Sequence, residues 1–96
     1  MKLLTKEIEK KLIKQHEGDI TVQAKFFDPQ SQWTWFAISY DPNTKTFFGL
    51  VKGLEIEYGY FSLDELKNYK GKFGLGIERD MYFVPKPVSE VEKELN

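Results

Sequence analysis

Residues 33–61, WTWFAISYDPNTKTFFGLVKGLEIEYGYF, decide the fold, because they predict three strands in a row. Aromatic and β-branched residues, which favour strands, fill residues 33–40, 47–52 and 54–61. The first two strands are separated by Asp41-Pro42-Asn43-Thr44, where proline presets φ and the Asp and Asn side chains can bond the backbone. Gly53 permits a tight reversal before the third strand. Three strands joined by short turns make an antiparallel meander.

Helical spacing and capping residues predict helices on both sides of this meander. Residues 5–14 carry an apolar stripe behind a capping Thr5. Ser62 and Ser89 each stand three residues before a glutamate, which is the capping-box spacing that opens a helix.

Two further segments predict strands. Residues 20–27 alternate between apolar and polar side chains, as a half-buried strand does, and residues 77–83 are expected to form an edge strand that ends before Pro85. The sequence therefore predicts one α+β domain over residues 1–96. It has an antiparallel sheet of four or five strands and two or three short helices.

Composition excludes several classes of function. The 14 basic and 15 acidic residues nearly cancel, whereas proteins that bind duplex nucleic acid carry a basic excess. The chain has no cysteine, so disulfides and cysteine-ligated metals are excluded. Charged residues near the N-terminus leave no room for the apolar region of a signal peptide. No apolar run is long enough to span a membrane. We therefore expect a cytoplasmic protein with no cofactor, no membrane partner and no duplex nucleic-acid partner.

Five ordered segments also suggest a family. They are Met1 to Glu7 (MKLLTKE), Trp33-Thr34-Trp35, Phe47 to Val51 (FFGLV), Gly59 to Leu66 (GYFSLDEL), and Ile77 to Asp80 (IERD) followed by Tyr82-Phe83. Together they resemble an uncharacterised family of small bacterial, plasmid and phage proteins, the domain-of-unknown-function family 2958. The resemblance implies no activity and no functional residues. It does imply a setting on mobile elements, and hence a role in maintaining the element or in countering host defence.

Trp33 and Trp35 are the leading candidate binding residues. Strand alternation places them on one face of the sheet and Phe36 on the other. If each strand turns its more apolar set to the core, the predicted core contains Phe26, Phe36, Ile38, Tyr40, Ile56 and Tyr58. The opposite face then collects Trp33, Trp35, Gln23, Lys25, Glu55 and Glu57. Large rings among hydrogen-bonding groups suit the anchoring of a partner. Alternatively, a helix or the C-terminal segment covers the tryptophans and makes a second small core.

The remaining motifs favour structural roles. Arg79 lies between two acids and can either lock a loop or present a cation to an anionic ligand. His16 is the single histidine and follows a helix, so a structural or solvent-facing role is favoured. The glycines of residues 71–76 match neither the dinucleotide-binding fingerprint nor the phosphate loop of nucleotide-triphosphate-binding proteins. The segment therefore favours a flexible turn. Acidic residues that could gather around a metal or act in catalysis are Asp28, Asp41, Glu55, Glu57, Glu78 and Asp80.

Three functions are consistent with these observations. The favoured one is a non-enzymatic binding or regulatory protein of a mobile element or phage. It would act as a monomer or homodimer on a host or element-encoded protein through the Trp33 and Trp35 face, and could inhibit a defence system. The second is a small oligomeric protein that sequesters a nucleotide-like ligand, with the base stacked on a tryptophan and the phosphates near Lys25 or Arg79. The third is a hydrolase that uses Glu55, Glu57 and Asp80.

Overall fold

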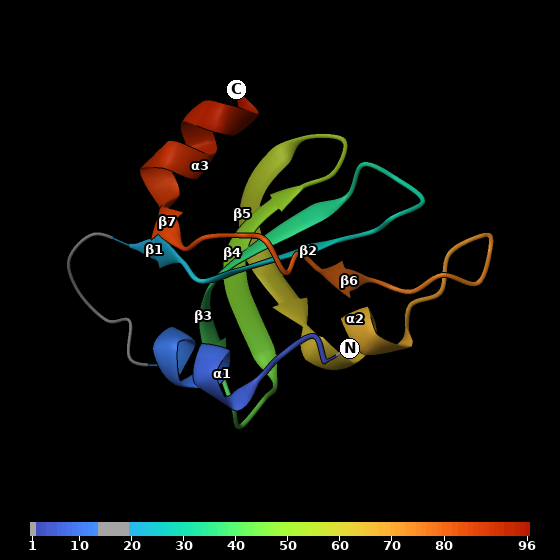
Figure 1. The fold of residues 1–96 in the computed structure, drawn as a ribbon, viewed down its shortest axis with the longest axis horizontal. Coiled ribbons are helices and arrows are strands. Elements are labelled where there is room, and N and C mark those ends of the chain that lie inside the picture. The colour runs from blue at the N-terminus through green and yellow to red at the C-terminus, as the bar shows by residue number, and fades with distance from the viewer. Residues whose placement is uncertain (1, 14–19) are drawn as a thin grey trace.

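A computed structural model of the chain describes residues 2–13 and 20–96, and within them contains three helices and seven strands (Figure 1). His16 and its predicted role lie outside the described residues. The elements in chain order are α1 (Lys6–Ile13), β1 (Thr21–Val22), β2 (Ala24–Phe27), β3 (Thr34–Asp41), β4 (Thr46–Lys52), β5 (Ile56–Ser62), α2 (Leu63–Asn68), β6 (Glu78–Arg79), β7 (Lys86–Pro87) and α3 (Val88–Leu95).

Five strands form one antiparallel sheet in the order β5-β4-β3-β2-β6. Strands β3, β4 and β5 are the predicted meander, and the α+β class is confirmed. At one edge, β6 is shorter than the strand predicted over residues 77–83. The chain turns after Arg79 because the Asp80 carboxylate accepts the backbone N–H of Tyr82 at 2.9 Å.

The strand predicted over residues 20–27 is divided between two sheets. Val22 pairs with Lys86 in a small sheet made by β1 and β7, whereas Ala24 pairs with Ala37 in the main sheet. The prediction of one continuous strand was therefore wrong. The two halves also pack in different cores, Val22 with Phe36 and Ala24 with Phe26, and periodicity within one segment cannot show this.

A β-bulge in β3 changes which side chains share a face. Ala37 pairs with Gly49 and Ser39 pairs with the preceding Phe48, so Ile38 is an extra residue. After the bulge, Tyr40 lies opposite Phe47, on the same face as Ala37. The prediction that Tyr40 shares a face with Phe36 was therefore wrong.

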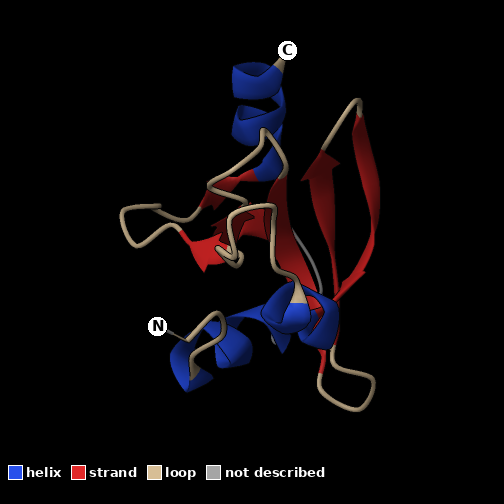
Figure 2. Ribbon diagram, turned by 90° about the vertical axis from the view of Figure 1, so that its right-hand side faces the viewer, coloured by secondary structure: helices blue, strands red, loops and turns tan. Residues whose placement is uncertain are grey.

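Each face of the sheet carries its own core, and Figure 2 shows α3 at one end of the molecule and α1 and α2 at the other. The α2 face packs against α1 and α2, and its buried residues include Phe26, Tyr40, Phe47, Phe61 and Leu66. The α3 face packs against α3 and Phe83, and its buried residues include Phe36, Ile38, Leu50 and Val91. The predicted core residues therefore fall on two faces rather than one. Of these, Ile56 is half-buried, and Tyr58 is 47% exposed while its hydroxyl donates to the Glu92 carboxylate.

Side-chain caps begin two of the helices. The Thr5 hydroxyl accepts the N–H of Ile8 at 3.2 Å, and the Ser62 hydroxyl accepts the N–H of Glu65 at 3.3 Å. The capping box predicted at Ser89 was wrong, because α3 begins one residue earlier, at Val88, behind Pro87 and without a side-chain cap. None of the helices described has the length and apolar character needed to cross a membrane.

This difference between the two serines can be tested. Ser62→Ala should lower the free energy of unfolding by about 1 kcal/mol, because an orphan N–H of α2 loses its acceptor. Ser89→Ala is the matched control. It should change stability by no more than about 0.5 kcal/mol, because Ser89 lies inside the first turn of α3 and is exposed. Urea denaturation of both variants checks the prediction, and equal losses would contradict it.

Candidate functional site

Trp33 and Trp35 lie together at the start of β3, as predicted. Their ring centroids are 6.1 Å apart, with 30° between the ring planes. Trp35 is half-buried against the core of the α2 face, whereas Trp33 remains 42% exposed. The Trp33 ring lies against Gly53 so closely that a Cβ on this glycine would be 2.4 Å from a ring atom. Gly53 therefore allows the ring to rest on the β4–β5 turn.

A pocket opens beside the two tryptophans. Its volume is about 420 Å³, and its walls come from the β2–β3 loop, β3, the end of β5, α2 and the segment before β6. Apolar walls are made by Phe61, Leu66 and Ile77. Two shallower hollows share the Trp33 ring with it, one over Val51 and Tyr60, the other over Leu54 and Glu57. We call this continuous surface the Trp33–Trp35 groove.

Asp28 is the buried polar residue of this groove. Its side chain lines the pocket, and the residue is only 4% exposed. One carboxylate oxygen accepts the N–H of Gln30 at 3.0 Å, and the other accepts the hydroxyls of Ser31 at 2.9 Å and Tyr69 at 3.1 Å. Burial alone would raise the pKa of Asp28, but these hydrogen bonds outweigh burial and hold the pKa below its ordinary value. Asp28 is therefore ionised at neutral pH.

The pKa of Tyr69, which donates one of these hydrogen bonds, is shifted in the opposite direction. The hydrogen bond to the Asp28 carboxylate raises the pKa of Tyr69, with smaller contributions from burial and from the carboxylate charge. The Tyr69 hydroxyl therefore stays protonated and acts as a donor. It ties α2 to the β2–β3 loop across the pocket.

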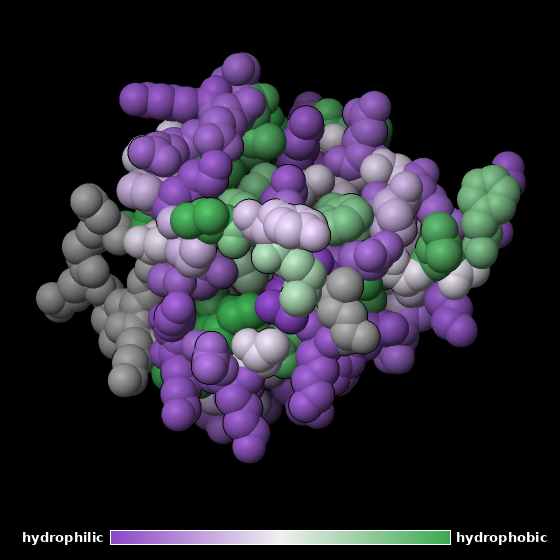
Figure 3. Space-filling view, viewed as in Figure 1, coloured by the Kyte–Doolittle hydropathy of each residue, from purple (hydrophilic) through white to green (hydrophobic). Residues whose placement is uncertain are grey.

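A neighbouring loop projects beside the pocket. The Gln30 side chain holds it, accepting the N–H of Phe73 at 2.6 Å and donating to the carbonyl of Leu75 at 3.4 Å. Gly71 makes room for this amide, because a Cβ there would be 1.5 Å from the Gln30 side-chain nitrogen. Phe73 in this loop is 77% exposed. The loop is the projection at the right of Figure 3, where apolar side chains gather. Residues 71–76 thus form the predicted turn between a helix and a strand.

The charge of the groove is acidic. Carboxylates on its walls belong to Asp28, Glu55, Glu57 and Glu65. Among the described residues that line the three hollows, none is a lysine, an arginine or a histidine.

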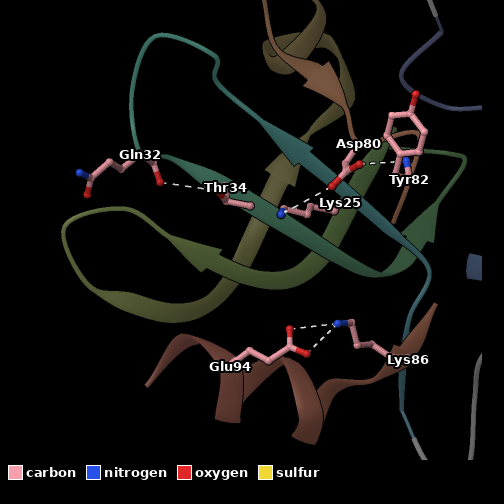
Figure 4. A network of polar contacts seen from close by, with 7 residues as sticks. All are labelled: Lys25, Gln32, Thr34, Asp80, Tyr82, Lys86 and Glu94. Atoms are coloured by element: carbon pink, nitrogen blue, oxygen red, sulfur yellow. Dashed lines mark hydrogen bonds and ion pairs between the residues drawn. The ribbon is translucent and has the colours of Figure 1, made fainter. Parts of the chain in front are cut away.

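Lys25 does not join this groove, which corrects the predicted grouping. Lys25 pairs with Phe36, on the α3 face, whereas its neighbour Phe26 pairs with Trp35. The Lys25 ammonium lies 3.6 Å from the Asp80 carboxylate (Figure 4). It is also 5.8 Å from the centre of the Phe36 ring. The prediction failed because it assumed one covered face, whereas both faces of this sheet carry a core.

Of the remaining predicted binding residues on the sheet, Glu55 and Glu57 line the groove and Gln23 does not. Glu57 lies on the tryptophan face, opposite Val51, which in turn is opposite Trp35. Glu55 lines the same shallow hollow as Glu57 and Trp33. Gln23 lies between β1 and β2, where its backbone N–H donates to the carbonyl of Ala37 at 3.0 Å.

Arg79 supports the structural alternative. It pairs with Phe26 in the sheet, and its Nε donates to the backbone carbonyl of Lys2 at 3.2 Å. The side chain therefore fastens the N-terminal segment to β6. This locking role was one of the two predicted, although the acceptor is a carbonyl and not a neighbouring acid.

The acidic residues proposed for hydrolysis do not converge. Glu57 is on β5 and Asp80 follows β6, and these strands are opposite edges of the sheet. Within the described part of the chain, no three Asp, Glu, His or Cys side chains gather in a way that could hold a metal ion. The third functional hypothesis therefore has no geometric support.

Fold and site define a small α+β domain with an acidic, tryptophan-lined groove along one face of its sheet. The chain belongs to the family described as protein of unknown function (DUF2958), whose model matches residues 2–93. This confirms the resemblance found in the sequence. No curated protein and no solved structure gives a significant match to the chain.

Proposed function

We propose that this protein is a non-enzymatic binding protein that docks a protein partner in the Trp33–Trp35 groove. The partner is a protein of the bacterial host or of a mobile element, and binding regulates or inhibits it. The observation that carries the proposal is the Trp33 ring, 42% exposed at the mouth of a pocket of about 420 Å³.

The arrangement suits recognition of a side chain. Tryptophan is enriched at the energetic centres of protein interfaces, because a large rigid ring buries much area at a small entropic cost. Trp33 is backed by Trp35 and rests on Gly53, so its ring is held in place before a partner arrives. The pocket beside it is within the range of volumes that hold small ligands, and it also accommodates an anchoring side chain.

The charge of the groove favours this proposal over the nucleotide-like ligand. Phosphates need cationic or N–H donors, and the two cations predicted for that role are engaged elsewhere. Lys25 lies on the α3 face beside Asp80, and the Arg79 guanidinium donates to the carbonyl of Lys2. The groove instead presents carboxylates, which repel phosphates.

Trp33→Ala tests the proposal. Loss of the ring should weaken partner binding by about 2 kcal/mol, or roughly 30-fold, as expected for a tryptophan at the centre of an interface. The measurement is quantitative mass spectrometry of proteins captured from a host lysate by the tagged variant and by the unaltered protein. Circular dichroism should show that both are folded.

The matched control is Tyr82→Ala, which removes another aromatic ring, one that is 94% exposed and lies away from the groove. Proteins that bind the groove should be captured by the Tyr82→Ala variant and lost from the Trp33→Ala variant. If both variants capture the same proteins in the same amounts, the groove is not the docking surface.

A further inference from the structure

We infer that the Trp33–Trp35 groove selects an arginine side chain of its partner, with the guanidinium at the carboxylates and the stem against the aromatic rings. This inference rests on the proposed function and names the chemistry of the group that is bound. Its grounds are the acidic groups, the aromatic surface and the absence of a cation among the described lining residues.

The acidic side of the pocket includes an exposed carboxylate. Asp28 is itself engaged by the backbone N–H and the side chain of Gln30 and by the hydroxyls of Ser31 and Tyr69, so it contributes negative charge to the pocket wall. Glu65 lines the same pocket from α2 and is exposed. Hydrogen bonds from a guanidinium to carboxylates are charge-assisted, and hence among the stronger ones in proteins.

The aromatic side of the pocket suits the same ligand. Trp33, Trp35 and Tyr69 all line it, and the faces of tryptophan and tyrosine rings attract cations. Phe61, Leu66 and Ile77 supply apolar walls, against which the three methylene groups of an arginine can lie. A small inorganic cation would use only the carboxylates, whereas arginine uses both sides of the pocket.

Charge complementarity favours a cation over a neutral group. The two ion pairs among the described residues join Lys25 to Asp80 and Lys86 to Glu94 (Figure 4). None of these four residues lines the groove. No ion pair among the described residues therefore neutralises the carboxylates of the groove, and their negative charge attracts a cationic ligand. Arginine is favoured over lysine because a guanidinium is planar, stacks on aromatic rings and is more weakly hydrated than an ammonium.

The test uses the groove's own fluorescence. The chain contains two tryptophans, and both line the groove, so tryptophan emission reports binding there directly. The probes are the peptide acetyl-Gly-Arg-Leu-Gly-amide and the same peptide with citrulline, which has the shape of arginine without its charge. Arginine should bind at least tenfold more tightly than citrulline. Equal affinities would overturn the inference, as would failure of the arginine peptide to bind.

Variants locate the effect in the pocket. Glu65→Gln should weaken the arginine peptide about fivefold and leave the citrulline peptide unchanged. Glu90→Gln, which neutralises an exposed acid on α3, should leave both peptides unchanged. An equal loss in the two variants would point to the net charge of the protein and would overturn a specific site.

Failure of this inference is distinguishable from failure of the proposed function. If Trp33→Ala loses captured proteins but arginine has no advantage over citrulline, the groove docks a partner through other chemistry. Tighter binding of adenosine monophosphate than of the arginine peptide would overturn both proposals and support a nucleotide-like ligand. If neither the peptides nor captured proteins depend on Trp33, the site itself is wrong.

Discussion

Gly49→Ala should destabilise the domain by about 3 kcal/mol or more, a large fraction of the stability of a domain of this size. Gly49 lies in the middle of β4, opposite the bulged part of β3. A Cβ at this position would be 1.9 Å from the carbonyl oxygen of Phe36 and 3.2 Å from the Cα of Ala37. Both atoms belong to the backbone, so no side-chain rotation can relieve the clash. The two strands would have to move apart.

Gly59→Ala is the matched control for this prediction. Gly59 pairs with Gly49 in the neighbouring strand, yet a Cβ there would have no atom within 4 Å. This variant should be unchanged or more stable by about 0.5 kcal/mol, because alanine loses less backbone entropy than glycine on folding. Urea denaturation followed by circular dichroism gives both values. A comparable loss in the two variants would show that β3 and β4 do not approach as closely as described.

The meander could be predicted from the sequence because its determinants are local. Turn residues at Asp41-Pro42-Asn43 and Gly53 separate three runs of strand-forming residues, and the structure has strands in all three places. The cap of α2 at Ser62 is equally local and was found. In each case the decisive contacts join residues within a few positions of one another, so their spacing in the sequence is sufficient.

Local spacing could not predict on which face of the sheet each side chain lies. In β3 both alternating sets are apolar, with Trp35 and Ala37 on one side and Phe36 and Ile38 on the other. Choosing one set as the core placed Lys25 with the tryptophans, whereas the observed register places it opposite Phe36. Register and bulges depend on contacts between strands, and a shift of one residue reverses every side chain.

Asp28 shows the same contrast between local and long-range contacts within the candidate site. Both Asp28 and Asp41 precede a proline, and each accepts the backbone N–H of the residue two positions later. That local turn is readable from the sequence. The third partner of Asp28 is Tyr69, which is 41 residues away and reaches the carboxylate only because α2 packs beside the β2–β3 loop. The sequence therefore identified Asp28 as an acidic loop residue but not as the buried acid of the groove.

Asp28→Ala should lower the free energy of unfolding by about 3 kcal/mol at pH 7, because three hydrogen bonds to a buried charged group are lost together. Asp41→Ala is the matched control. It removes the same kind of turn at an exposed residue, where the hydrogen bond from Asn43 is 2.9 Å long, and should cost no more than about 1 kcal/mol. Similar losses in both variants would mean that the turn matters and the buried network does not.

The pH dependence separates the charge of Asp28 from its shape. Asp28→Asn keeps the size of the side chain but cannot ionise. The pKa of Asp28 in the folded protein is lower than in the unfolded chain, where it is about 3.9, so the ionised form stabilises the fold at higher pH. The advantage of the unaltered protein over Asp28→Asn should be constant from pH 7 to about pH 5 and shrink as the pH falls through the folded-state pKa. Urea denaturation across this range measures the difference. An advantage that does not shrink on acidification would mean that Asp28 contributes through shape and neutral hydrogen bonds.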